Sequence, residues 1–433
     1  MTTQSRALRG VGPLVTAYAV VTVLLTTVVS WAQGLPLAAE ITNRSQIVTG
    51  DPIWIDAWVR WDSNWYGGIA ENGYFYHPGQ QSPIAFFPSY PMAVRLVAEL
   101  VGDVQVAGVL VTVLCGAASL VLFWRWLDGR VTSRARRLAT ASLMAYPYAF
   151  FIYGAMYSDA LFLLCVLAAF TALEARHFAL AGLIGAVATA GRPVGLALVA
   201  GLVVRTLEML AQSTSGRDKV SFRELVRALT TVRPRHTLVG LSVAGLLGWM
   251  AYLWFAFGNP VAFADAQSSP GWDQGAGPRT WFKVGFGGQM LHGPWDIKAI
   301  LFAQFFVCLL AVLAIPQVFR RFGWGYLTYA VIVLGIPLVG SKDFLGCGRY
   351  VMMAFPVFAV LGALLDQQPR RISARAASER EGLRRRLHAR VHPHDVLDGG
   401  VDGAIGLDED VVRVARAAIE LREERLEGGR PGQ

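Results

Sequence analysis

The stretch GVGPLVTAYAVVTVLLTTVVSWAQGLPLAA, residues 10–39, contains no charged side chain. A transmembrane helix needs about 20 predominantly apolar residues, so this stretch is long enough to hold one. It is also longer than the apolar region of a secretory signal peptide, and no convincing cleavage site follows it. We therefore predict a retained transmembrane helix here, the first of several.

Other uncharged apolar stretches follow along the chain. They are residues 104–124, 138–158, 160–173, 178–191, 193–204, 237–264, 299–319, 322–341 and 350–365. Together they predict about ten membrane-embedded segments. The composition agrees, because 54% of the 433 residues are hydrophobic and only 16% are charged, whereas soluble domains have roughly 25% charged residues. The predicted fold class is an all-α polytopic membrane protein.

The net charge of +9 comes from basic residues that lie mostly between the apolar stretches. A nucleic-acid surface would need a continuous basic face with interleaved aromatic residues. The sequence has no such pattern, so we expect no nucleic-acid partner. The four cysteines form no CxxC motif and the seven histidines have no ligand spacing, so we expect neither a metal nor a cofactor.

Clusters of arginine predict which loops face the cytoplasm, because cytoplasmic loops carry an excess of Lys and Arg. Arg6 and Arg9 place the N-terminus there, and loops 125–137 and 205–236 follow the same rule. The first loop, residues 34–90, is then extracytoplasmic. We expect the plasma membrane as the location, with membrane lipids around the chain.

Residues 1–366 form the predicted transmembrane domain, and residues 367–433 differ sharply from it. This tail contains 13 Arg, 12 acidic residues and no aromatic residue. We predict that it is cytoplasmic. Its nature stays open: it is disordered, or partly helical and partner-binding, or the product of a shifted reading frame in GC-rich DNA.

Residues 178–204 are predicted to form two short helices that enter the membrane. Cytoplasmic signals flank them on both sides, so the chain crosses twice or enters and returns. Gly191-Arg192-Pro193 interrupts the two apolar arms, and such a break is typical of broken helices that line a cavity. This topology gathers the polar features on the extracytoplasmic face: residues 40–88, 157–159, 192, 258–298 and 341–350.

The densest group of polar and aromatic residues follows the first helix and reads Trp58-Val59-Arg60-Trp61-Asp62-Ser63-Asn64-Trp65-Tyr66. Asp62 is a candidate general base that would take a proton from an acceptor hydroxyl, with the aromatic side chains around it tuning its basicity. The alternative is an interfacial aromatic belt in which Arg60 and Asp62 make a purely structural contact.

This group and several later motifs resemble the PIG-V-like mannosyltransferases, relatives of GPI mannosyltransferase 2 that also occur in actinobacteria. The resemblance spans roughly residues 10–366, and its first motif is fairly specific. The motifs are Arg60-Trp61-Asp62-x-x-Trp65-Tyr66, Gly73-Tyr74, Phe86-Phe87-Pro88-x-Tyr90-Pro91, Tyr157-Ser158-Asp159-Ala160-Leu161-Phe162, Ala190-Gly191-Arg192-Pro193-Val194-Gly195, Arg349-Tyr350 and Phe355-Pro356-Val357-Phe358.

The resemblance implies a GT-C-type enzyme, which is a polytopic and metal-independent glycosyltransferase that uses a sugar linked to a lipid phosphate. It implies transfer of mannose from a polyprenyl-phosphate donor to a lipid, glycan or protein acceptor outside the cytoplasm, with inversion. The family's base is the aspartate of the first outer loop, which corresponds to Asp62. Family members usually continue with apolar sequence where this chain has its charged tail.

Two arginines are candidates for holding the donor phosphate. Arg192 and Arg349 lie in or beside apolar segments, where an unpaired guanidinium is costly and a phosphate is a natural partner. The alternatives are an ion pair with Asp159 for Arg192, and snorkelling to the interface for Arg349. Asp159 and Tyr350 would support the two arginines, although a helix cap equally explains Tyr157-Ser158-Asp159.

The predicted catalytic residue is therefore Asp62. The predicted substrate-binding residues are Arg60, Trp61, Trp65, Tyr66, Asp159, Arg192, Arg349 and Tyr350. The tryptophans of loop 258–298 would stack on sugar rings or form an aromatic belt. The competing functions are a transporter or flippase of lipid-linked sugars, which the break at Arg192 also suits, and an inactive scaffold homologue.

Overall fold

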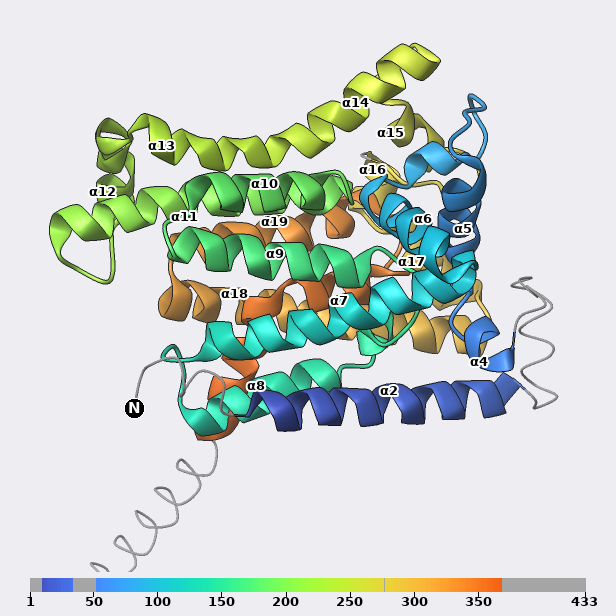
Figure 1. Ribbon diagram of the computed structural model, residues 1–433, viewed down its shortest axis with the longest axis horizontal. Coiled ribbons are helices and arrows are strands. Elements are labelled where there is room, and N and C mark those ends of the chain that lie inside the picture. The colour runs from blue at the N-terminus through green and yellow to red at the C-terminus, as the bar shows by residue number, and fades with distance from the viewer. Residues whose placement is uncertain (1–9, 34–51, 276, 368–433) are drawn as a thin grey trace, which may run out of the picture. The chain divides into compact units, whose positions relative to one another are not determined.

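A computed structural model describes residues 10–33, 52–275 and 277–367 (Figure 1). All regular secondary structure in these residues is helical. The charged tail predicted from residue 367 onward lies outside the described residues except for Gln367, and so does the beginning of the first loop, residues 34–51. The described part therefore confirms the all-α class.

The helices have the following bounds. The α-helices are α2 (Val11–Gln33), α4 (Ile53–Asp56), α5 (Ser63–Asn72), α6 (Ser89–Val101), α7 (Val104–Leu127), α8 (Ser133–Met144), α9 (Asp159–Glu174), α10 (Phe178–Thr189), α11 (Leu196–Ser215), α12 (Phe222–Arg227), α13 (Pro234–Thr237), α14 (Ala244–Phe257), α15 (Ala262–Gln267), α16 (Pro278–Trp281), α17 (Val284–His292), α18 (Trp295–Phe322), α19 (Trp324–Gly340) and α20 (Cys347–Met353). Short 3-10 helices are η1 (Pro83–Ala85), η2 (Ala149–Ile152), η3 (Pro193–Gly195), η4 (Ala228–Thr231) and η5 (Leu238–Val243). A last helical segment covers Phe355–Gln367.

Five helical segments of the described chain are long and apolar enough to cross a membrane. They are Val11–Ala32, Val104–Leu127, Pro193–Ser215, Pro234–Phe257 and Trp295–Phe322. A sixth span is possible if α20 and the helix after it, which meet at an angle of 75°, count as one. The protein is thus a polytopic membrane protein, while the ten embedded segments expected from the sequence stay a prediction.

The uncharged stretch 138–158 does not form the single long helix that its composition suggests. Instead, α8 ends at Met144, and the chain continues through the short helix η2. The reason is Pro147, which lacks a backbone N–H and disfavours helical conformation in the residue before it. Apolar composition alone therefore overestimated the length of the helix in this segment.

The break predicted in residues 178–204 is present, but its second arm is longer than expected. Arg192 is fully extended (φ −159°, ψ 145°), and Pro193 opens η3, which leads directly into α11. α11 then continues to Ser215, so this arm is long enough for a span. The backbone N–H of Ser89 donates to the carbonyl of Ala190 (2.9 Å) and ties the break to the first loop.

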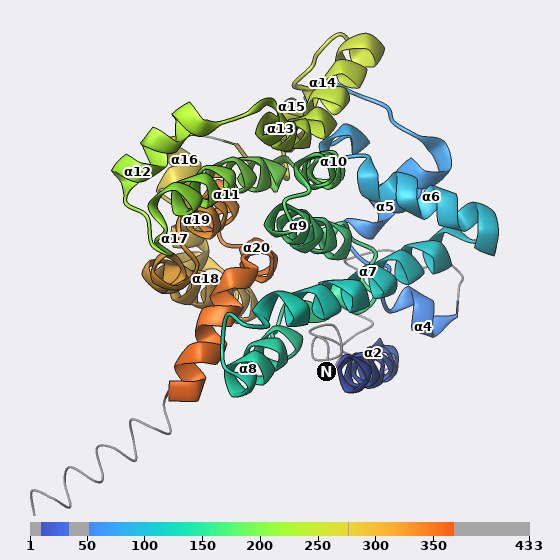
Figure 2. The same ribbon diagram turned by 60° about the vertical axis from the view of Figure 1, so that its left-hand side comes forward.

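α9 occupies the centre of the described helices, between α7, α10, α11 and α20 (Figure 2). Most of its residues are buried, which explains why its sequence is apolar on every face. Its buried side chains include Phe162, Leu163, Val166 and Phe170.

The loops gather at two ends of this helical body (Figure 1). We name them after α5 and α12. The α5 end holds residues 52–90, 157–159, 190–193, 258–275, 277–298 and 341–350, and the α12 end holds residues 128–132, 175–177, 216–233 and 320–323. The polar features that the sequence placed on one face, as far as the described residues include them, therefore share one end of the structure.

Candidate functional site

The backbone around Asp62 is fixed by contacts on both sides. Trp61 adopts a left-handed conformation (φ 52°), which is uncommon for a residue with a large side chain. The next N–H, of Asp62, donates to the hydroxyl of Tyr157 (2.9 Å), and the N–H of Arg60 donates to Ser63 Oγ (3.1 Å). The turn before α5 therefore holds Asp62 in one position at the N-terminus of that helix.

The carboxylate of Asp62 pairs with Arg349. Asp62 Oδ2 lies 3.5 Å from Arg349 Nη1, and the Asp62 side chain is 31% exposed. The carboxylate is thus reachable from solvent. Burial lowers the pKa of Arg60, while the charge of Asp56 acts in the opposite direction. The role predicted for Arg60 beside Asp62 stays a prediction.

A second acidic and basic pair lies deeper. Asp159 Oδ1 is 2.5 Å from Arg192 Nη1, with side-chain exposures of 0% and 7%. Neither oxygen of Asp159 accepts a hydrogen bond of good geometry from the described residues, so the ion pair is what compensates its burial. The ion pair named as one interpretation of Arg192 is therefore present.

Tyr350 contacts both arginines. Its ring centroid is 4.8 Å from the Arg192 guanidinium carbon and 5.7 Å from that of Arg349, within the range of cation–π contacts. Arg349 also lies 5.6 Å from the ring centroid of Tyr157. Asp62, Asp159, Arg192, Arg349 and Tyr350 thus form one group, which we call the arginine–aspartate cluster.

Tyr66 connects α5 to the start of α9. Its hydroxyl is 2.9 Å from Ser158 Oγ, and its ring meets those of Tyr90 and Tyr157 edge-on. Burial raises the pKa of Tyr66 to about 12, so its hydroxyl stays neutral. Ser158 makes no capping hydrogen bond to α9, and its hydroxyl is engaged by Tyr66 instead, contrary to the cap interpretation.

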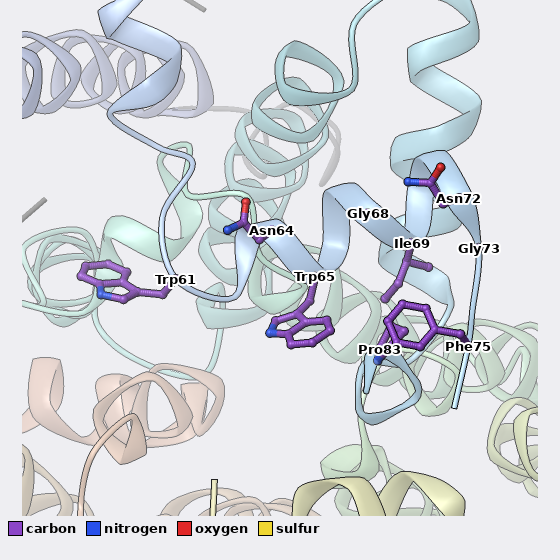
Figure 3. Close-up of a pocket in the computed structure, with 9 residues that line it drawn as sticks. All are labelled: Trp61, Asn64, Trp65, Gly68, Ile69, Asn72, Gly73, Phe75 and Pro83. Carbon is purple, nitrogen blue, oxygen red and sulfur yellow. The ribbon is translucent and has the colours of Figure 1, made fainter. Parts of the chain in front are cut away.

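A pocket of about 390 Å³ opens along α5 (Figure 3). Trp61 lies at one end of the lining, Trp65 in the middle, and Phe75 with Pro83 at the other end. The complete lining is Trp61, Asn64, Trp65, Gly68, Ile69, Asn72, Gly73, Phe75 and Pro83. Trp61 directly precedes Asp62 in the chain, and Asp62 itself does not line the pocket.

One of the three tryptophans of loop 258–298 contacts Trp65 of this lining. Trp65 stacks on Phe86 (5.8 Å between centroids, 17° between planes) and meets Trp272 edge-on (5.6 Å). Trp281 and Trp295 are exposed and belong to no such group. Among the described residues, loop 258–298 therefore contributes Trp272 to the pocket surroundings.

Four residues of the site were absent from the residues predicted to bind substrate: Tyr157, Ser158, Phe86 and Phe151. Tyr157 fixes the Asp62 backbone, and Phe151 lies 5.7 Å from the Arg349 guanidinium carbon. Tyr157, Ser158 and Phe86 stand inside the motifs quoted above, which was the available signal. Phe151 lies outside those motifs. No group of three or more His, Cys, Asp or Glu in the described chain could hold a metal ion.

Comparison with known proteins gives one match. A family model described as Mannosyltransferase (PIG-V) matches residues 44–272, which is more than half of the chain. The matched range contains Asp62, Asp159, Arg192 and Trp272, and it ends before Arg349. No curated protein and no solved structure matches the chain.

Proposed function

The chain belongs to the PIG-V mannosyltransferase family, and on this premise we propose that it transfers mannose from a polyprenyl-phosphate donor to an extracytoplasmic lipid, glycan or protein acceptor. Family membership makes it a membrane glycosyltransferase. The donor, the inversion at the anomeric carbon and the residue roles are our proposal. The observation that carries it is the ion pair between the partly exposed carboxylate of Asp62 and Arg349.

The proposed reaction is a single displacement. The acceptor hydroxyl oxygen bonds to the anomeric carbon of mannose while the bond from that carbon to the donor phosphate oxygen breaks. Asp62 takes the hydroxyl proton, and polyprenyl phosphate leaves with the electron pair and one additional negative charge. A carboxylate that is 31% exposed and fixed at its backbone suits this role, since a general base must reach the acceptor.

In this step Arg349 would pair first with the Asp62 carboxylate and then with the leaving phosphate. Before the reaction it balances the Asp62 carboxylate at 3.5 Å. Once Asp62 is protonated, the guanidinium charge is released for the leaving phosphate, so the charge of the site does not change. Arg349 Nε is buried and donates to no described residue, which leaves a donor for a phosphate oxygen.

In this proposal Arg192 positions Arg349 and does not bind the phosphate itself. It is nearly buried and paired with the fully buried Asp159, so a phosphate would have to compete with that carboxylate. The Tyr350 ring contacts both arginines. We therefore assign Arg192, Asp159 and Tyr350 to positioning Arg349, and the aromatic wall of Trp61 and Trp65 to binding a sugar ring.

The experiment that tests this function is a transfer assay with purified full-length protein in lipid nanodiscs. Polyprenyl-phosphate-mannose and a mannose nucleotide, each labelled in the sugar, are supplied with extracted membrane lipids and glycans as acceptors. We expect mannosylated product and polyprenyl phosphate in equal amounts from the lipid donor. We also expect a product whose anomeric configuration is opposite to that of the donor, read by NMR.

Two results would reject the proposal. Transfer from the nucleotide donor alone would assign the wrong donor class. Movement of intact labelled donor across a liposome bilayer, without release of polyprenyl phosphate, would support the transport function instead.

A further inference from the structure

A second pocket, of about 470 Å³, lies at the α12 end, away from the arginine–aspartate cluster. Three chain segments form it: the turn after α7, the end of α11 with the loop that follows it, and the connection from α18 to α19 (Figure 1). Its charged lining comprises Arg130, Arg205, Glu208, Asp218, Lys219, Arg320 and Arg321. We call it the basic pocket.

In the inner wall of the basic pocket, the charge of Arg205 is balanced by carboxylates. Arg205 donates to both oxygens of Glu174 (2.8 and 3.2 Å) and to Glu208 Oε2 (2.9 Å). Glu208 in turn accepts from the backbone N–H groups of Trp324 (2.9 Å) and Gly325 (3.2 Å). A carboxylate thus already occupies the positive N-terminus of α19, and the inner wall is rigid and satisfied.

The outer rim differs, because its positive charges are not compensated. Arg320, Arg321 and Lys219 are exposed and form no ion pair with any described residue. Asp218 is the acidic residue beside them. A concave surface of this kind concentrates positive potential, and it favours an anion that can accept several N–H groups at once.

Apolar surface adjoins the rim. Phe319 lines the pocket, is 38% exposed and directly precedes Arg320 in α18. Trp324 also lines the pocket, and its indole N–H donates to the Val220 carbonyl (2.9 Å). Arg321 also lines an adjoining opening of about 390 Å³ with Arg130 and Thr132. Cationic and apolar groups side by side match a molecule with an anionic head and a hydrocarbon body.

We propose that the basic pocket binds a phosphate group through Arg320, Arg321 and Lys219, and that its source is the headgroup of an anionic lipid. This site is separate from the proposed transfer reaction and uses none of its residues. General positive charge at a membrane surface is the competing explanation, since it needs no defined site.

The test uses purified full-length protein in detergent. It is titrated separately with phosphatidylglycerol, phosphatidylcholine and inorganic phosphate. Lipid binding is read by native mass spectrometry, and phosphate binding by calorimetry. The variant is Arg320→Gln/Arg321→Gln. The matched control is Arg223→Gln/Arg227→Gln, which removes two exposed charges from the same end but outside the pocket. Unfolding temperatures establish that both variants are folded.

We expect the wild type and the control to bind phosphatidylglycerol more tightly than phosphatidylcholine. The pocket variant should raise the dissociation constant for phosphatidylglycerol at least tenfold, roughly 1.4 kcal/mol. Phosphate binding that depends on the same arginines, without a preference for phosphatidylglycerol, would keep the phosphate site but assign it to free phosphate. The proposal is overturned if the pocket variant binds both ligands like wild type, or if the control loses as much affinity.

Discussion

The buried pair of Asp159 and Arg192 is the residue-scale feature with the largest energetic consequence. Two charges leave water when they are buried, and each is tolerated only because the other is close. Here the pair is separated by 2.5 Å and nearly excluded from solvent. Its value to the protein is therefore the position it gives to the Arg192 guanidinium beside Tyr350.

We predict that Asp159→Asn strongly destabilises the protein. The substitution keeps the shape of the side chain but leaves Arg192 as an uncompensated buried cation, which typically costs about 3–5 kcal/mol. The free energy of unfolding in nanodiscs measures the effect.

The matched control is Asp273→Asn. Asp273 also pairs with a basic residue, Lys342 at 2.8 Å, but its side chain is 53% exposed, so the loss should stay below about 1 kcal/mol. The double variant Asp159→Asn/Arg192→Gln should cost less than Asp159→Asn alone. Equal losses at Asp159 and Asp273 would show that burial does not matter here.

Most site residues were predictable from sequence. The ion pair of Arg192 with Asp159 was one of two interpretations of Arg192, whereas the ion pair of Asp62 with Arg349 was not anticipated. The motifs identified Asp62, Asp159, Arg192 and Arg349 as chemically unusual residues near apolar segments. Which acid meets which base depends on contacts between distant parts of the chain, and no local pattern encodes these. The ion pair of Asp62 with Arg349 is the clearest case.

At the scale of elements, small residues set how closely helices approach. A Cβ atom on Gly245 of α14 would collide with the carbonyl oxygen of Ala186 in α10. A Cβ atom on Gly248, three residues later in α14, would meet nothing within 4 Å. Replacing each of these two glycines by alanine therefore distinguishes the effect of close helix packing, at Gly245, from the effect of helix propensity, at Gly248.

We predict that Gly245→Ala destabilises the protein by about 1–3 kcal/mol, because α14 must shift away from α10. Gly248→Ala should be neutral or stabilising by up to about 1 kcal/mol, since alanine favours the helix. Thermal unfolding of both variants in the same nanodiscs decides. Equal effects would contradict the close contact between α10 and α14.

Trp65, in the lining of the α5 pocket, contacts a tryptophan from a distant part of the chain. Trp65 comes from α5 and Trp272 from the loop after α15, and their rings meet edge-on. A sugar bound in the pocket would lie against Trp65, the tryptophan in the middle of the lining.

We predict that Trp65→Ala raises KM for the donor or acceptor about tenfold, because it removes stacking area worth roughly 1–2 kcal/mol. The rate constant kcat should change less, since no reacting atom is touched. Trp281→Ala, an exposed tryptophan outside the wall, is the control and should leave both constants unchanged. A fall in kcat at unchanged KM would place the sugar elsewhere.

The elements themselves were predictable where apolar composition continued without a break. α2, α7 and α18 correspond to long uncharged stretches, and their identification needed only length and hydropathy. The prediction of one continuous helix over residues 138–158 was wrong because hydropathy does not detect the break that Pro147 causes. The length of α11 was underestimated because its last turns are polar and lie beyond the apolar run.

At the scale of the whole molecule, the described chain has two chemically different ends. The α5 end collects aromatic residues and the arginine–aspartate cluster, while the α12 end collects exposed basic residues. The sequence predicted this separation from charge alone, because charge at the ends of spans follows membrane orientation. Charge could not predict the two pockets, which arise only when separate loops meet.

We predict that the α5 end faces outward. Single cysteines are introduced by Gln80→Cys at the α5 end and by Ser213→Cys near the α12 end, both at exposed positions. In intact cells a membrane-impermeant maleimide should label the first, and it should label the second only after permeabilisation. The native cysteines are buried or half-buried and give little background. The reverse labelling pattern would refute the orientation and the outer location of the reaction.

The most direct test of the central claim is the single-turnover rate of mannose transfer by Asp62→Asn protein. General-base catalysis contributes roughly 10²–10⁴-fold, so we predict a loss of that size with donor binding retained. Glu71→Gln, which removes an exposed carboxylate from the same helix, should transfer at the wild-type rate. Full transfer by the Asp62→Asn protein would contradict the account.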